Sequence, residues 1–352
     1  MNLFKSLYRL SAVAVVASLL AGCNTLVLNA PGDVARQQGN LIIIATVLML
    51  LIIVPVIALT LFFAWKYRAS NTKATYKPDW DHSTQLELVI WSAPLLIIIA
   101  LGSITWITTH TLDPYRPLER IAEGKPIPEG VQPLEVEVVS LDWKWLFIYP
   151  EQGIATVNEL ATPVDRPIKF KLTSSTVMNA FYVPALAGMI YTMPGMQTEL
   201  NAVISTPGEY HGLSSNYSGA GFSGMRFAYH AYEQADFDAW VARVKSAGQS
   251  LGREGYLELE KPSVREPVRY YASVDAELYQ AVLNRCVDPR RMCMHEMMAI
   301  DAGNGAGRTG MEGLEVRSRG DVRGRKFVQS AMCSSDDAPA AGLATTLSRS
   351  AP

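Results

Sequence analysis

Apolar residues divide the chain into two long uncharged runs near the N-terminus and a later part with short alternating segments. The runs Leu41–Trp65 and Leu88–Thr109 contain no charged residue. At about 1.5 Å per residue, each is long enough to cross a hydrocarbon core of about 30 Å. A buried core helix of that length would rarely lack charges altogether. The pattern therefore predicts two transmembrane helices, residues 41–65 and 87–109, joined by a loop of residues 66–86.

The loop between the two runs is the most basic part of this region. It contains Lys66, Arg68, Lys73 and Lys77, whereas the outer flanks carry mainly Arg36 and Arg116. Short basic loops stay on the cytoplasmic side of a membrane. We therefore expect a cytoplasmic loop, with residues 23–40 and all residues after 109 on the outer side.

The first residues have the layout of an export signal. Lys5 and Arg9 precede a short apolar core, and the segment Leu20–Cys23 resembles a bacterial lipobox. Such a layout predicts a lipoprotein signal peptide over residues 1–22 and a mature chain that is acylated at Cys23. The alternative is an ordinary signal anchor with a chance cysteine.

From Pro133 onward the periodicity changes to two. Leu134, Val136 and Val138 alternate with other residues, and short segments of the same kind follow between Gly- and Pro-containing turns. This pattern is typical of strands and predicts a β-sandwich over residues 133–232, after a linker of residues 110–132. Trp143 and Trp145 fall on one face of a predicted strand, where aromatic residues usually pack in a core.

The last third of the chain begins with two amphipathic helical patterns, Phe237–Ala247 and Ala276–Cys286. They predict a small helical appendage over residues 233–287. Residues 288–352 lack periodicity and are predicted to be a disordered tail. The four cysteines are scattered, so we expect no disulfide framework. Cys293 and His295, with nearby methionines, offer a soft-metal alternative to a plain solvated tail.

Composition adds little beyond an exclusion. The chain is 49% hydrophobic and 18% charged, with a formal net charge of −2. Such a composition lacks the excess of positive charge that is typical of nucleic-acid-binding proteins.

Several long motifs resemble one family. They are Trp65–Asn71, Asp142–Trp145, Tyr149–Glu159 and Gly219–Met225. In this order they resemble subunit II of the cytochrome bo-type ubiquinol oxidases, which belong to the haem-copper oxidase superfamily. The resemblance implies a membrane-anchored α+β chain: two transmembrane helices forming a hairpin, a cupredoxin-like β-sandwich, and a small C-terminal helical appendage.

The segment Tyr210–Met225 resembles the loop that holds the binuclear copper centre CuA in related oxidases, but most ligand positions have changed. The corresponding residues are Asn179, Ser214, Asn216, Ser218, Phe222 and Met225. A CuA centre requires thiolates together with imidazole. The resemblance therefore implies that this chain binds no metal or other cofactor, with CuA absent and the haems and CuB held by subunit I. A weak site of His211 and Met225 is a further alternative.

Glu87 stands at the start of the second apolar run and has two interpretations. The spacing of Thr84 and Glu87 is that of a helix capping box. A carboxylate at a membrane boundary is also a candidate for proton transfer. The resemblance favours the second role, because Glu87, Trp91 and Pro94 match the pattern at a proton-channel entrance of the family.

The resemblance implies subunit II of a proton-pumping ubiquinol oxidase in a bacterial inner membrane. The chain would have no catalytic residue of its own, would assist assembly and proton uptake, and would contact subunit I through Trp143 and Trp145. Its other partners would be subunits III and IV and the bilayer, with ubiquinol used by the complex and no role for cytochrome c. The rival interpretations are an electron-carrying subunit II of a cytochrome c oxidase and a stand-alone cupredoxin-fold lipoprotein.

Overall fold

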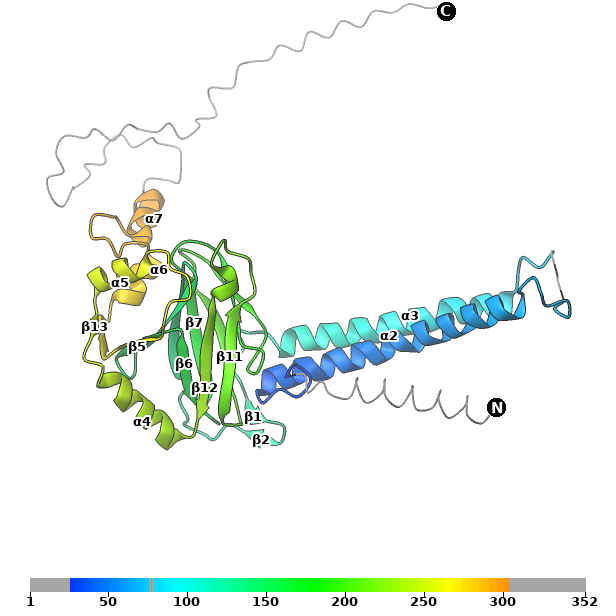
Figure 1. Cartoon of the computed structure of the whole chain (residues 1–352), viewed down its shortest axis with the longest axis horizontal. Helices are drawn as coiled ribbons and strands as arrows, with labels where there is room; N and C mark the ends of the chain where they lie inside the picture. Colours follow the sequence, from blue (N-terminus) through cyan, green and yellow to red (C-terminus); the bar gives the residue numbers. More distant parts are fainter. Residues whose placement is uncertain (1–25, 76, 78, 304–352) are drawn as a thin grey trace, which may run out of the picture. The chain divides into compact units, whose positions relative to one another are not determined.

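Two long helices open the described part of the chain, which the computed structural model gives as residues 26–75, 77 and 79–303. Helices α2 (Asp33–Lys66) and α3 (Thr84–Thr111) are both long and apolar enough to cross a membrane, as predicted (Figure 1). Their apolar side chains stay exposed in the chain alone, for example Trp91 at 76%. Such a surface suits lipid or another membrane helix rather than water.

Both helices are longer than the apolar runs that predicted them. Helix α2 begins at Asp33 rather than Leu41, because its first two turns are polar and an apolar-run criterion does not count them. Asp33 lies in the first turn, where the helix dipole favours a negative charge. Helix α3 likewise includes three residues before Glu87 and two residues after Thr109.

The start of α2 is bonded to the β-domain. The Gly32 amide donates to the Ala185 carbonyl oxygen at 2.9 Å, and Arg120 Nε lies 3.0 Å from Asp33 Oδ2. A Cβ atom on Gly32 would lie 2.4 Å from the Leu186 carbonyl oxygen, so glycine is required there. These contacts join the membrane hairpin to the domain at the outer end of α2.

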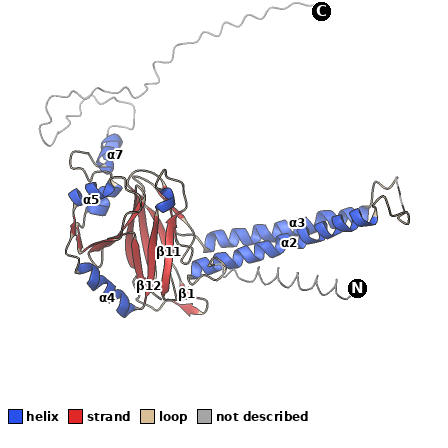
Figure 2. Cartoon of the chain, in the orientation of Figure 1, coloured by secondary structure: helices blue, strands red, loops and turns tan. Residues whose placement is uncertain are grey.

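The β-domain has two main sheets, which Figure 2 shows in red. The first is six-stranded in the order β10-β7-β3-β4-β5-β14, and the second is five-stranded in the order β6-β12-β11-β8-β9. A small hairpin of β1 (Arg120–Ala122) and β2 (Lys125–Pro126) lies in the predicted linker. The strands of the main sheets are β3 (Leu134–Leu141), β4 (Lys144–Tyr149), β5 (Ile154–Val157), β6 (Glu159–Pro163), β7 (Ile168–Ser174), β8 (Asn179–Tyr182), β9 (Ile190–Thr192), β10 (Thr198–Ala202), β11 (Gly208–Ser214), β12 (Arg226–Tyr232) and β14 (Arg269–Tyr271).

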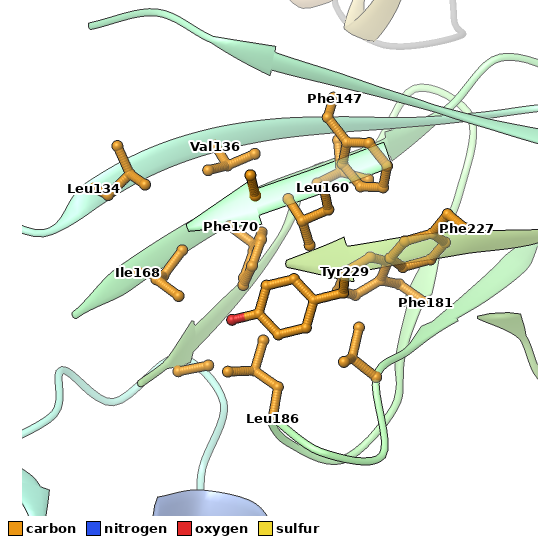
Figure 3. Packing of buried hydrophobic residues seen from close by; sticks show 14 of the residues in the cluster. Leu134, Val136, Phe147, Leu160, Ile168, Phe170, Phe181, Leu186, Phe227 and Tyr229 are labelled. Atoms are coloured by element: carbon orange, nitrogen blue, oxygen red, sulfur yellow. The ribbon is translucent and has the colours of Figure 1, made fainter. Parts of the chain in front are cut away.

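Aromatic side chains fill the space between the two sheets. Phe147 and Phe170 from the first sheet meet Phe181 and Phe227 from the second (Figure 3). The Phe181 and Phe227 rings are stacked with centroids 5.5 Å apart. Burial of such large rings is the main source of stability in a sandwich.

The helical appendage packs against both the main core and the outer face of the first sheet. Its elements are α4 (Gln234–Lys245), β13 (Ser250–Leu251), α5 (Arg253–Glu260), β15 (Ser273–Val274), α6 (Leu278–Leu283) and α7 (Met294–Gly303). Helix α4 buries the apolar stripe that predicted it, including Phe237 and Trp240. Trp240 Nε1 donates at 2.7 Å to Glu159, whose buried carboxylate also accepts from the Tyr270 hydroxyl. A second apolar cluster lies under α5 and α6.

Two expectations for the C-terminal part were wrong. Cys286 and Cys293 form a disulfide, because the tight turn after α6 brings them together, and scattered sequence positions do not reveal that turn. Helix α7 occupies Met294–Gly303, inside the segment predicted to be a disordered tail. With its sulfur in a disulfide, Cys293 is no free thiolate for a soft metal. Residues 304–352 and the predicted signal peptide with Cys23 lie outside the described residues.

One acidic side chain is partly enclosed beneath the appendage. Glu137 points to the outer face of β3, on the same side as Val139, which belongs to the apolar cluster around Tyr279 of α6. Burial raises the pKa of Glu137 to about 7; nearby Glu135 adds to the rise and Lys171 opposes it. The folded domain therefore favours the protonated form of this side chain.

This raised pKa predicts a pH-dependent stability. The folded-state value of about 7 exceeds the ordinary 4.5, so the contribution of Glu137 to stability is fully present below pH 4.5 and is lost as the pH rises through 7. After discounting for solvent screening, the loss is on the order of 2 kcal/mol. Thermal unfolding of the full chain in detergent at pH 5 and pH 8 should show this slope, and Glu137→Gln should flatten it. Glu151→Gln, at an exposed ion pair with Arg166, should leave the slope unchanged. An equal slope in Glu137→Gln would contradict the assignment.

Candidate functional site: the former copper loop and the start of α3

Two of the positions that correspond to copper ligands meet in the structure. Asn179 opens β8 and Ser214 closes β11, and these neighbouring strands pair in the second sheet. The Ser214 hydroxyl lies 3.2 Å from Asn179 Oδ1, and both side chains are buried. A neutral hydrogen bond therefore joins the two strands at this point.

The rest of the former copper loop, which comprises residues Tyr210–Met225, is held by further hydrogen bonds and by aromatic packing. Asn216 Nδ2 donates to the Met178 carbonyl oxygen at 3.1 Å. Tyr217 and Phe222 pack edge to face, with ring centroids 5.6 Å apart. Met225 is buried in the main core at 1% exposure. Ser214 and Asn216 thus bond to the protein itself, whereas the buried Ser218 hydroxyl has no hydrogen-bond partner among the described residues.

Trp143 packs on this loop, and the sequence pattern assigned it to the wrong kind of backbone position. It does not continue a strand face, because it lies in the turn between β3 and β4 with a φ of 65°. Its Nε1 donates to the Ser218 carbonyl oxygen at 3.1 Å. A Cβ atom on Gly221 would lie 2.4 Å from the indole ring. The ring therefore packs directly on the loop, and Gly221 leaves the space for it.

Trp145, by contrast, cannot contact another subunit, so that expectation was wrong. It has no exposed surface and packs edge to face on Phe181 and Phe227, at 5.4 Å and 5.8 Å between ring centroids. Trp145 is instead a core residue, because it follows the turn and points between the two sheets.

A segment of the appendage covers the other side of the loop. Lys144 is almost fully buried, and its Nζ donates to the Lys261 carbonyl oxygen and the Ser263 hydroxyl, each at 2.7 Å. Burial lowers the pKa of Lys144, although the carboxylates of Glu266 and Asp142 oppose that effect. The segment then places Arg265 against Gly224, with its Cγ 3.1 Å from where a Cβ atom would lie. The loop is therefore packed from two sides.

This donor set does not fit a copper centre. The positions offer two side-chain amide oxygens, two hydroxyls, a phenyl ring and one buried thioether, while CuA-like and type 1 sites need thiolate and imidazole. His211 is exposed on β11 and Met225 is buried in the core, so the alternative pair is not assembled. His230 stacks on Tyr232 and lies 4.0 Å from Glu159.

Glu87 lies in the first turn of α3, but not in the capping box that its spacing indicates. Ser83 is the N-cap residue, and no side chain caps the amides. Instead, His82 Nδ1 lies 2.8 Å from Glu87 Oε1, and His82 Nε2 lies 3.1 Å from the Thr84 hydroxyl. The sequence pattern gave no role to His82 here, because a pair at i and i+5 follows no helical rule.

Comparison with known proteins identifies the family. Residues 137–245 match the model for the cytochrome c oxidase subunit II periplasmic domain, and residues 245–290 match the COX aromatic rich motif. The chain is 51% identical over 267 residues to the cytochrome bo(3) ubiquinol oxidase subunit 2 of Pseudomonas putida, covering 76% of this chain and 82% of that one. The chain belongs to the subunit 2 family of cytochrome bo(3) ubiquinol oxidases.

A second relative agrees with this assignment. The ubiquinol oxidase subunit 2 of Acetobacter aceti is also 51% identical, covering 76% of this chain and 84% of that one. The periplasmic domain of subunit II of the Bradyrhizobium japonicum cytochrome oxidase is 24% identical, with a TM-score of 0.32 over 34% of this chain and 97% of that one. At that score we draw nothing further from the structural likeness.

The packing of Trp143 on Gly221 predicts a specific loss of stability in this family member. Gly221→Ala should destabilise the β-domain by about 1–3 kcal/mol, because the new methyl group would overlap the indole ring. Thermal unfolding of the full chain in detergent measures the effect. Gly252→Ala, at a glycine outside the membrane spans with open space around it, is the matched control.

A double variant makes this test selective. If the ring is the obstacle, Trp143→Leu combined with Gly221→Ala should cost less than the sum of the single changes. Additive losses would mean that the Gly221 backbone, and not the ring contact, sets the effect.

Proposed function

We propose that this chain is subunit II of a proton-pumping ubiquinol oxidase in a bacterial inner membrane, and that it carries no redox centre of its own. The observation that carries the proposal is the donor set of the former copper loop, in which Asn179 and Ser214 bond to each other. Without thiolates the loop offers no path for electrons from a soluble donor. Ubiquinol would then deliver electrons within the membrane, to the haems and CuB of subunit I.

The role of this chain would be structural, with subunit I as its main partner and subunits III and IV in the same complex. A set of exposed apolar residues beside the loop supports a contact surface: Val177, Met178, Met189, Tyr191, Met196 and Tyr217. Clustered exposed apolar residues often mark an interface. Trp143 would support this surface from behind the loop, while Trp145 would act only through the core.

Copper analysis separates this proposal from its electron-carrying rival. The purified complex should contain no copper attributable to this chain, because no thiolate and imidazole pair is available at the loop. Metal analysis and visible absorption of the separated subunit II, after dialysis against copper, would measure it. One or more retained copper ions per chain with CuA-type absorption would refute the proposal. A chain that purifies without any haem-bearing subunit would favour the stand-alone lipoprotein instead.

We further propose that Glu87 helps to take up protons from the cytoplasm. Its position at the cytoplasmic start of α3 supports this, as does its half-exposed carboxylate beside His82. A carboxylate and an imidazole 2.8 Å apart can pass a proton between them. Because Glu87 forms no capping box, its carboxylate is not bonded to the backbone amides at the start of α3.

Glu87→Gln should lower the quinol oxidase turnover of the purified complex several-fold with normal haem content, because the amide cannot carry a proton. Oxygen consumption with ubiquinol as donor measures the turnover. Asp81→Asn, an exposed carboxylate of the same loop, is the matched control and should be neutral. Unchanged turnover in Glu87→Gln would remove the proton role and leave only an electrostatic contribution to the helix start.

The lipid anchor at Cys23 is also a proposal. The residues after Cys23 support this proposal. Val27 lies against α2, because its carbonyl oxygen would be 2.6 Å from a Cβ atom on Gly39. Leu26, Val27 and Leu28 are exposed there, next to the start of the apolar span. Mass spectrometry of the N-terminal peptide should show acyl chains on Cys23, and an unmodified or uncleaved N-terminus would contradict it.

A further inference from the structure

A hollow of about 270 Å³ lies where the outer end of the helical hairpin meets the β-domain. Four segments form it: the first turns of α2 (Asp33, Gln37, Gln38), residues 111–120 from the end of α3, the loop at Gly188 and Met189, and β10 at Leu200 and Asn201. Neither the former copper loop nor Glu87 contributes to it. We refer to it as the interfacial hollow.

The interfacial hollow combines an apolar floor with a charged rim. Val34, Leu112, Leu118 and Leu200 line it from below, and these residues belong to the main core or pack against it. The rim carries two guanidinium groups and three carboxylates: Arg116, Arg120, Asp33, Asp113 and Glu119. A ligand that matches both parts must be amphipathic and must carry charges of both signs.

Hydrogen bonds and ion pairs hold several of these charged groups in place. Asp33 is buried, and its Oδ2 accepts from Gln37 Nε2 at 2.7 Å and from Arg120 Nε at 3.0 Å. Arg120 is therefore held in place while its side chain stays 41% exposed. Arg116 pairs with Glu119 and is 43% exposed. Both guanidinium groups can still donate to a phosphate oxygen, a geometry that arginine suits well.

The hollow also lies at the right depth for a lipid headgroup. Gln37 precedes the first residue of the apolar run, Leu41, by four positions, or about 6 Å along the helix. The headgroup layer adds roughly 5–8 Å to each side of the hydrocarbon core. Thr111, at the end of α3, lines the same hollow from the second helix.

We propose that the interfacial hollow binds one zwitterionic aminophospholipid of the outer leaflet, of the phosphatidylethanolamine class. Arg116 and Arg120 bind its phosphate, and Asp113 and Glu119 accept from its ammonium group. A choline headgroup has no N–H donor for these carboxylates, and an anionic glycerol headgroup brings no cation to a rim with more carboxylates than guanidiniums. The bound lipid would fill the junction between the hairpin and the domain.

The test counts lipids on the intact oxidase complex that contains this chain. Native mass spectrometry of the delipidated complex, titrated with phosphatidylethanolamine, phosphatidylcholine or phosphatidylglycerol of the same acyl chains, gives the occupancy of each. Arg116→Gln and Asp113→Asn are the test variants; the second keeps the side-chain oxygen that accepts from the Tyr115 amide. Arg253→Gln, at an exposed ion pair of the appendage, is the matched control.

We expect each test variant to leave this site partly empty at concentrations that just fill it in the wild type. The concentration for half-occupancy should rise about tenfold, the effect of losing one charge-assisted hydrogen bond. The control should match the wild type. Equal retention in wild type and both variants would overturn the proposal, as would equal binding of the three lipids. Binding of water-soluble phosphoethanolamine as tight as that of the lipid would also overturn it, since the apolar floor would then contribute nothing.

Discussion

The aromatic cluster between the two sheets is the interaction on which the rest of the domain depends. Phe181 and Phe227 stack face to face, and Trp145 and Phe147 pack against them from the opposite sheet. Gly212 is glycine because a Cβ atom there would lie 1.9 Å from the Phe227 ring. The cluster fixes β8, β11 and β12 relative to β4. Asn179 and Ser214 lie on β8 and β11, and the other positions that correspond to copper ligands lie between β11 and β12. A metal is therefore not needed to hold them together.

The loop is held by ordinary protein contacts at the positions that correspond to copper ligands. Where metal–ligand bonds would join two strands, a hydrogen bond between Ser214 and Asn179 does so. The indole of Trp143 and the segment around Arg265 enclose the loop on two sides. Each contact is worth far less than a metal–ligand bond, but several weak contacts over a rigid core can keep one loop conformation. Contacts within the chain thus suffice to hold this loop.

Sequence patterns predicted the features that depend on period and length. The apolar runs of α2 and α3, the alternation of Leu134, Val136 and Val138, and the stripe of α4 all report burial in a regular geometry. The errors occur where the chain leaves that geometry. Trp143 has a left-handed backbone at a turn, so counting by two gave the wrong face. The pairing of His82 with Glu87, and of Cys286 with Cys293, depends on local turns that no periodicity encodes.

The Cys286–Cys293 disulfide has a consequence for how the chain must be made. Such a bond persists in an oxidising compartment and is rare in the cytosol. With the domain on the outer side, as the basic loop predicts, the segment joining α6 to α7 closes its disulfide only after export, and its oxidation state then reports on which side of the membrane the domain folded. A chain inserted with its basic loop outward would leave both thiols reduced. The two cysteines thus act as a built-in reporter of membrane topology, independent of the charges that direct it.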